Sequence, residues 1–187
     1  MGSKLKVDES SLSGLYIITP NSYKDERGAF SRVFCIDELN DLLKGKTIQQ
    51  VNHSLSVQKG TVRGMHFQYA PDCEVKMVKC MKGKILDVVV DIRKGSKTFL
   101  ETFSVELSQE NQKMLYIPEG FAHGFQTLEE NTELLYFHTK LYSSENEGAL
   151  NIKDPLLNIN FPLDIISLSD RDKEHKFLNN SFEGITV

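Results

Sequence analysis

The chain has 187 residues, of which 40% are hydrophobic and 26% are charged, and its formal net charge is −4. This length and composition suit one globular domain with a real core, spanning residues 1–187. The slightly negative charge does not indicate nucleic-acid binding, and no apolar run approaches the ~20 residues of a membrane span. We therefore expect neither nucleic acid nor a membrane as a partner.

The number and spacing of the three cysteines indicate the redox state of the compartment in which the protein functions. They are odd in number and lack a CxxC spacing, which argues for a reducing compartment and against a disulfide framework or a structural zinc site. The first residues, "MGSKLKVDESS", lack the apolar core of a signal peptide. We expect a cytoplasmic protein.

Short strand-like runs dominate the chain. They are rich in Val, Ile, Tyr, Phe and Thr, and turn signals such as "RKGSK" and "SQENQ" separate them. Many short strands at close spacing predict an all-β sandwich, jelly roll or barrel with a few short peripheral helices. In chain order, strands are predicted at 14–20, 60–68, 75–83, 84–92, 102–108, 113–120, 124–129 and 133–142.

Helix signals are few. One helix is predicted at 35–45, where Gly45 acts as a stop signal and four apolar residues recur at helical spacing: Ile36, Leu39, Leu42 and Leu43. A second short helix is expected in the polar tail after Leu168.

His66 lies in the strand-like run "VRGMHFQ". Gly64 leaves space beside His66, as where another group approaches the backbone. The spacing alone leaves His66 open as a buried, hydrogen-bonded histidine or as a functional residue. Regular alternation would place Val62, Gly64, His66 and Gln68 on one face and Arg63, Met65 and Phe67 on the other.

His123 lies in "IPEGFAHGF", a turn that either aims a side chain into a barrel mouth or simply packs. A catalytic metal needs three protein ligands, commonly two histidines and a carboxylate. Only His66 and His123 are candidates to lie close together, the run from His66 to Gln68 lacks an HxH pair, and no nearby carboxylate presents itself. Metal catalysis is therefore disfavoured.

Lys76 lies in a mostly apolar strand. A lysine that points into a barrel needs a partner, because burying an unpaired charge is costly. Otherwise Lys76 and Lys79 are solvent residues at a sheet edge. They fall on opposite faces of one strand, so at most one of them points inward.

Tyr136 and Tyr142 are six residues apart and share a face if 133–142 is one regular strand. Tyrosines that face a cavity can donate a proton or stack on a flat ring. They are also common strand residues.

Four ordered motifs resemble one enzyme family. The motifs "VRGMHFQ", "KGKILDVVVDIRKGSKTF", "LSQENQKMLYIPEGFAHGFQTL" and "LSDRD" are similar to those of the dTDP-4-dehydrorhamnose 3,5-epimerases, which are cupin-fold nucleotide-sugar epimerases. The resemblance covers about residues 13–175. It implies a jelly-roll cupin, usually a homodimer, that uses no metal or organic cofactor and inverts stereocentres beside the 4-keto group of a nucleotide-linked deoxysugar.

The resemblance also implies four chemical roles. The reaction needs a base beside the carbonyl, an electrophile for the enolate oxygen and an acid on the opposite face. His66 matches the base, and Asp172 matches the carboxylate that orients its imidazole. Lys76 matches the lysine near the keto oxygen, where a fixed positive charge favours the enolate over the ketone. Tyr136 matches the proton donor.

Further positions match the family's substrate contacts. Arg63 and His123 match residues near the diphosphate and the sugar, and a planar guanidinium suits phosphate oxygens. Tyr142 matches the ring that stacks on the base. The remaining binding positions are Gln50, Val51, Asn52, Glu147 and Arg171, together with Arg27 and Phe30, which match residues that reach the nucleotide across the dimer.

The chain departs from the family pattern in three places. Arg32 stands where "DERGxFxE" has a glutamate on the nucleotide side, which reverses a charge. The run "QYAPDCEVK" replaces the more usual "PPxxQAK", and "ALNIKDP" lacks a tryptophan common in this stretch. These departures bear on the nucleotide and the sugar, because none touches the four chemical positions.

The leading interpretation is an isomerase that epimerises C3, C5 or both in a 4-keto-6-deoxy sugar carried on dTDP, as in the conversion of dTDP-4-dehydro-6-deoxyglucose to dTDP-4-dehydrorhamnose. The alternatives are a mono-epimerase acting on another nucleotide-linked 4-keto sugar, a metal-dependent cupin enzyme, and a non-catalytic sugar-nucleotide binding module.

Overall fold

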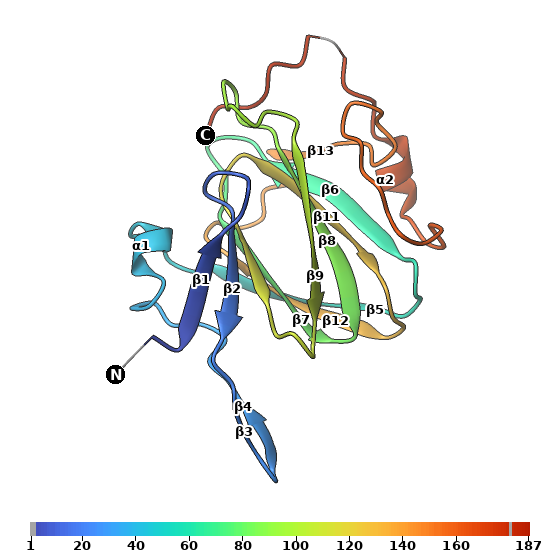
Figure 1. Cartoon of the computed structure of the whole chain (residues 1–187). Helices are drawn as coiled ribbons and strands as arrows, with labels where there is room; N and C mark the ends of the chain where they lie inside the picture. The colour runs from blue at the N-terminus through green and yellow to red at the C-terminus, as the bar shows by residue number, and fades with distance from the viewer. Residues whose placement is uncertain (1–2, 180) are drawn as a thin grey trace.

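Two facing antiparallel β-sheets form the body of the molecule in a computed structural model that describes residues 3–179 and 181–187 (Figure 1). The six-stranded sheet has the order β1 (Leu5–Glu9), β2 (Tyr16–Pro20), β10 (Met114–Ile117), β7 (Lys76–Lys82), β12 (Thr132–His138) and β5 (Gln50–Ser56). The five-stranded sheet has the order β13 (Glu147–Ala149), β6 (Val62–Gln68), β11 (Phe121–Thr127), β8 (Lys84–Asp91) and β9 (Thr102–Ser108).

Strand alternation fills the space between the sheets with apolar side chains. Val78 and Cys80 of β7 pack there with Val89 of β8 and Phe125 of β11, and all four are almost fully buried. Val78 and Cys80 are two residues apart, so they point to the same side of β7. Two further cores cover the outer faces of the sheets, one between β6 and the C-terminal segment and one between the six-stranded sheet and the segment around Leu39 and Leu43.

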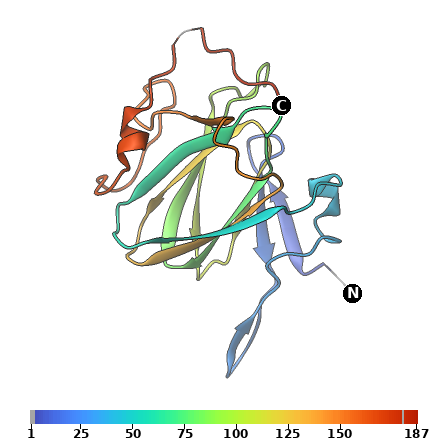
Figure 2. The same ribbon diagram turned by 180° about the vertical axis from the view of Figure 1, so that it is seen from behind.

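Four short elements lie outside the sheets. A hairpin of β3 (Tyr23–Asp25) and β4 (Gly28–Phe30) extends away from the barrel in both views (Figures 1 and 2). The helices are α1 (Asn40–Leu43) and α2 (Asp170–Glu174). Parallel bridges fasten the segment that carries α2, because Ser167 pairs with Thr61 and Ile185 pairs with Arg93. Among the described residues, no helix is long and apolar enough to cross a membrane.

The all-β prediction is confirmed, whereas several boundaries were wrong. The strand predicted at 124–129 begins at Phe121, and the one predicted at 133–142 ends at His138. The helix predicted at 35–45 is only the four residues of α1. Leu39 and Leu43 are buried as expected, but Ile36 is 45% exposed, so the apolar residues do not form one helical face. The strands β1, β3, β4, β5 and β13 were not predicted.

Candidate active site

A cavity of about 670 Å³ lies between the two sheets. The five-stranded sheet contributes one wall, the six-stranded sheet contributes the other, and the segment before and within α2 closes a third side. The cavity therefore gathers side chains that are distant in the sequence. The polar residues that line it include Arg63, His66 and His123 from the first sheet, Asn52, Ser54, Lys76, Tyr136 and His138 from the second, and Ser169, Arg171 and Asp172 from the third side.

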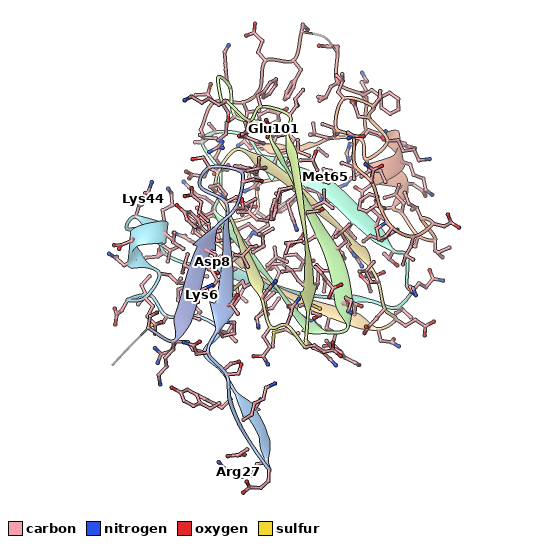
Figure 3. All side chains as sticks on the ribbon, viewed as in Figure 1. Lys6, Asp8, Arg27, Lys44, Met65 and Glu101 are labelled. Carbon is pink, nitrogen blue, oxygen red and sulfur yellow. The ribbon has the colours of Figure 1, made fainter. Side chains whose placement is uncertain are left out.

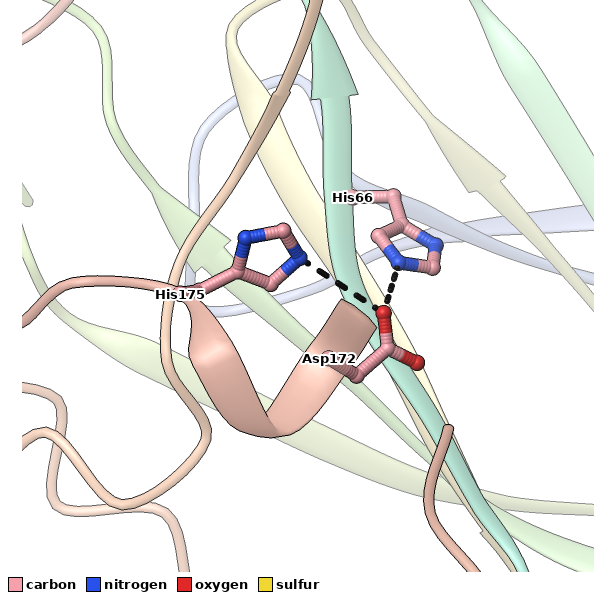
Figure 4. A group of neighbouring side chains, drawn as sticks. All are labelled: His66, Asp172 and His175. Carbon is pink, nitrogen blue, oxygen red and sulfur yellow. Dashed lines mark hydrogen bonds and ion pairs between the residues drawn. The ribbon is translucent and has the colours of Figure 1, made fainter. Parts of the chain in front are cut away.

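His66 and Asp172 form a hydrogen-bonded pair. His66 Nε2 lies 2.7 Å from Asp172 Oδ1 (Figure 4). The Ser169 hydroxyl caps α2 by accepting from the Asp172 backbone N–H at 3.1 Å, which holds the carboxylate in the first turn of the helix. Burial opposes ionisation of Asp172, but its hydrogen bond and charge interaction with His66 outweigh burial and lower the pKa of the carboxyl. Asp172 is therefore a carboxylate positioned to accept a hydrogen bond from one imidazole N–H.

Strand β6 departs from regular alternation at Gly64. Arg63 and His66 are three residues apart and would lie on opposite faces of a regular strand, yet both line the cavity. The register between β6 and β11 shifts between His123 and Phe125, opposite this point. A Cβ on Gly64 would lie 2.4 Å from the Cα of Gly124, so the close approach predicted at Gly64 is made by the backbone of β11.

Lys76 points into the cavity and is paired with Glu74. The Lys76 Nζ lies 3.3 Å from Glu74 Oε1, while His138 Nδ1 lies 2.7 Å from Glu74 Oε2. Burial opposes ionisation of Glu74, but the hydrogen bond to His138 and the charge of Lys76 outweigh it and lower the pKa of the carboxyl. The inward lysine thus has the partner that burial demands. The prediction missed Glu74, although it lies in the departing run "QYAPDCEVK".

Lys79 lies on the other face of β7, as predicted, but it is not a solvent residue. Its side chain is almost fully buried, and Nζ donates to the backbone carbonyl of Gln112 at 2.6 Å. Burial lowers the pKa of Lys79 to about 8. Only one of the two lysines therefore reaches the cavity.

Tyr136 lines the cavity from the sheet opposite His66. Its hydroxyl lies 3.1 Å from the Ser54 hydroxyl. Burial raises the pKa of the phenol well above its ordinary value. Tyr136 is therefore held as a neutral O–H group that can donate a proton.

His123 has a carboxylate partner that sequence reasoning missed. His123 Nε2 lies 2.5 Å from Asp87 Oδ1, and Asp87 is fully buried. In the β11–β8 register His123 is opposite Val89, and Asp87 is the diagonal neighbour two residues along the strand. The expectation of no carboxylate near the two histidines was therefore wrong. The one available signal was a charged residue inside the apolar run "KILDVVVDI".

A smaller cavity of about 340 Å³ adjoins the first, and four of the predicted substrate-contact residues line it: Gln50, Asn52, Tyr142 and Glu147. The Tyr142 hydroxyl donates to Glu147 Oε2 at 2.9 Å, and Arg171 binds both Glu147 oxygens at 2.9 Å. Because β12 ends at His138, Tyr142 reaches this site from the following loop and not from a strand shared with Tyr136. Gln50 and Asn52 line the cavity, whereas Val51 does not.

The hairpin residues lie outside both cavities. Arg27 lies at the hairpin tip and pairs with Asp25 (Figure 3), and Phe30 is 72% exposed. Arg32 donates to Glu38, whose carboxylate also accepts from the Leu5 backbone N–H. The charge reversed at position 32 is therefore neutralised within this chain.

Comparison with known proteins identifies the family. Residues 9–180 match the family model described as dTDP-4-dehydrorhamnose 3,5-epimerase. A relative of that name from Sinorhizobium fredii is 41% identical, over 90% of this chain and 87% of that protein.

Solved structures agree with this match. A dTDP-6-deoxy-D-glucose-3,5-epimerase from Legionella pneumophila, in complex with dTDP-4-keto-L-rhamnose, superposes with a TM-score of 0.87 at 37% identity over 92% of each chain. A 3'-monoepimerase from Streptomyces bikiniensis, in complex with dTDP-quinovose, superposes with a TM-score of 0.83 at 32% identity over 90% of this chain and 85% of that one. The jelly-roll cupin expectation is confirmed, and the chain belongs to the dTDP-4-dehydrorhamnose 3,5-epimerase family of isomerases.

Proposed function

We propose that this chain epimerises a 4-keto-6-deoxy sugar on dTDP, with His66 as the base and Tyr136 as the acid. The observation that carries the proposal is their placement on opposite sheets of one cavity. A proton removed from a carbon beside the carbonyl toward the His66 wall can be replaced from the Tyr136 wall. Return from the opposite face is what inverts the stereocentre.

His66 acts as a base through the nitrogen that Asp172 leaves free. A neutral imidazole carries one N–H, and with Nε2–H directed at Asp172 the lone pair is on Nδ1. The buried carboxylate then stabilises the imidazolium that forms when the proton is taken. Both effects lower the barrier to proton abstraction.

Lys76 stabilises the negative charge that develops on the sugar's keto oxygen. The ammonium is held at the cavity wall by Glu74, so it needs no reorganisation during the reaction. Because the enolate carries more negative charge than the ketone, the interaction strengthens toward the transition state.

The smaller cavity holds the nucleotide in this proposal. Tyr142 supplies the ring that stacks on the base, and Gln50, Asn52, Glu147 and Arg171 line or border the same space. Arg63 and His123 lie in the larger cavity, where they face the diphosphate and the sugar. The dTDP-sugar bound in the similar Legionella pneumophila structure supports this assignment.

A homodimer completes the proposed site. The β3–β4 hairpin extends away from its own barrel (Figure 2), and Phe30, the last residue of β4, is largely exposed. The outer face of β5 also exposes Val51 and Leu55, at 52% and 48%. A second copy would cover these apolar side chains and place the hairpin of one chain at the nucleotide of the other.

Solvent exchange tests the reaction. Incubation with dTDP-4-keto-6-deoxyglucose in D2O should place deuterium at C3, at C5 or at both, and His66→Gln should abolish the exchange. Deuterium at C3 alone would identify a mono-epimerase, the second candidate, which the similarity to the Streptomyces bikiniensis enzyme favours. Binding of the sugar nucleotide without exchange at either carbon would contradict both and indicate a binding module.

A further inference from the structure

A second histidine, His175, lies beside the His66–Asp172 pair. His175 caps the C-terminus of α2, three residues after Asp172, so the two side chains share one side of the helix turn. Its Nε2 is 3.6 Å from Asp172 Oδ1, the same oxygen that bonds His66 (Figure 4). This distance exceeds a hydrogen bond. His175 Nε2 is buried and has no hydrogen-bond partner within the described residues, and the side chain does not line the larger cavity.

The three groups have the separations of a metal-ligand set. One ligand atom from each of His66, Asp172 and His175 lies within 4.8 Å of the ligand atoms of the other two. Nitrogen and oxygen ligands about 2.0–2.1 Å from one ion are separated by roughly 2.9 Å at right angles and roughly 3.4 Å at tetrahedral angles. The observed separations of 2.7 and 3.6 Å from the carboxylate oxygen bracket this interval. Small side-chain rotations would therefore equalise the three ligands around an ion.

We propose that His66, Asp172 and His175 form a binding site for borderline divalent transition-metal ions such as Zn²⁺, and that a bound ion inhibits the enzyme. Two imidazoles and one carboxylate favour Zn²⁺, Co²⁺ or Ni²⁺. Mg²⁺ and Ca²⁺ prefer oxygen ligands and are not expected to bind. The ion is an inhibitor in this proposal and takes no part in the reaction.

The neighbouring positive charges are already paired. The Arg171 guanidinium lies close to His66, with Nη2 3.5 Å from Nε2, but it is bound by both oxygens of Glu147. The Lys76 ammonium is paired with Glu74. The carboxylate of Asp172 therefore supplies a negative charge that neither cation neutralises through a direct contact. The His66 imidazole beside it is itself a ligand, and the other groups that hydrogen-bond to the carboxylate, the Ser169 hydroxyl and the Gly64 backbone N–H, are neutral.

Inhibition follows from the single N–H of a neutral imidazole. In the free pair, Nε2 of His66 carries the hydrogen and Nδ1 carries the lone pair that takes the substrate proton. An ion on Nε2 needs that nitrogen's lone pair, so the hydrogen moves to Nδ1. His66 then has no lone pair left to act as a base. This consequence rests on the proposed function, whereas metal binding itself does not.

Metal titration of the full, metal-free chain tests the site. Calorimetry with ZnCl2 and the visible absorption of added CoCl2 should show one equivalent bound. His175→Gln should weaken Zn²⁺ binding at least about tenfold, because it removes a ligand. His53→Gln is the matched control. His53 borders the larger cavity, but its imidazole is half-exposed, contacts Glu133 at 3.2 Å and does not belong to the ligand set, so the affinity should be unchanged. MgCl2 should give no binding signal.

Deuterium exchange then separates binding from inhibition. Zn²⁺ should stop deuterium exchange catalysed by the wild type, and EDTA should restore it. Without Zn²⁺, the His175→Gln variant should catalyse exchange at the wild-type rate. Added Zn²⁺ should inhibit that variant much less than the wild type. Equal Zn²⁺ affinity in His175→Gln and the wild type would overturn the proposal. If thermal melting shows that His175→Gln is unfolded, Asp172→Asn serves as the second variant, and retained tight binding there would overturn the proposal equally. A chain that bound cobalt but showed no exchange would contradict the epimerase proposal alone.

Discussion

Replacing Asp172 with asparagine removes the negative charge from the hydrogen-bonded His66–Asp172 pair, here called the dyad. The asparagine side chain has nearly the same shape as the aspartate that it replaces. The carboxylate is 3% exposed and lies 2.7 Å from His66 Nε2. A hydrogen bond to a charged group contributes about 1.5–3 kcal/mol, which corresponds to roughly 10- to 100-fold in rate at 1.36 kcal/mol per decade. The asparagine amide can also hold the His66 imidazole in the tautomer that has no free lone pair on Nδ1, which lowers the rate further. We therefore expect Asp172→Asn to lower kcat by about 100-fold or more.

The assay uses NMR to measure the rate of deuterium incorporation from D2O at C3 and C5 of the sugar, at a saturating concentration of the sugar nucleotide. Binding of dTDP, measured by calorimetry, should change little, because Asp172 lies in the larger cavity and not among the residues that line the smaller one. Thermal melting serves as the folding control. Exchange by a folded Asp172→Asn at the wild-type rate would refute the role of the dyad.

Two further variants probe a second proton-transfer group and a buried ion pair. Tyr136→Phe should keep deuterium exchange at the carbon facing His66 but lose inversion, because the base remains and the acid does not; inversion at the wild-type rate would exclude Tyr136 as the acid. Asp91 is fully buried, and although burial opposes its ionisation, hydrogen bonds from Arg93, Ser96 and Thr98 outweigh this and lower its pKa to about 2. A lowered pKa adds stability above the ordinary pKa of about 3.9 that is lost as the pH falls through about 2. Asp91→Asn should therefore lower the free energy of unfolding by about 2 kcal/mol near neutral pH, with the gap closing below about pH 4 in denaturant titrations; a gap independent of pH would contradict this account.

Composition and alternation predict the sheets better than the site. The placement of Lys76 and Lys79 on opposite faces of β7 follows from the period of two, whereas the choice of which lysine points inward does not. The same rule fails for Arg63 and His66, because the register shift opposite Gly64 lies in the pairing with another strand and leaves no signal in β6 itself.

Contacts distant in sequence were the hardest to predict. Asp87 reaches His123 across a strand pair, and Asp172 reaches His66 from a helix 106 residues later. Spacing carries no information about either contact. The resemblance supplied Asp172 because "LSDRD" is a recognisable motif, whereas Asp87 lay inside a motif that was used only to recognise the family.

The dyad joins two parts of the molecule that are held by different forces. His66 belongs to a strand inside a continuous sheet, while Asp172 belongs to a five-residue helix on a segment fastened by two isolated bridges, at Thr61 and Arg93, and by apolar packing on the outer face of β6. Helices this short have little stability of their own, and such segments can open without global unfolding. In mild denaturant, catalysis should therefore fade while the far-UV signal of the sheets persists, so enzyme activity reports on the attachment of the C-terminal segment rather than on the integrity of the barrel.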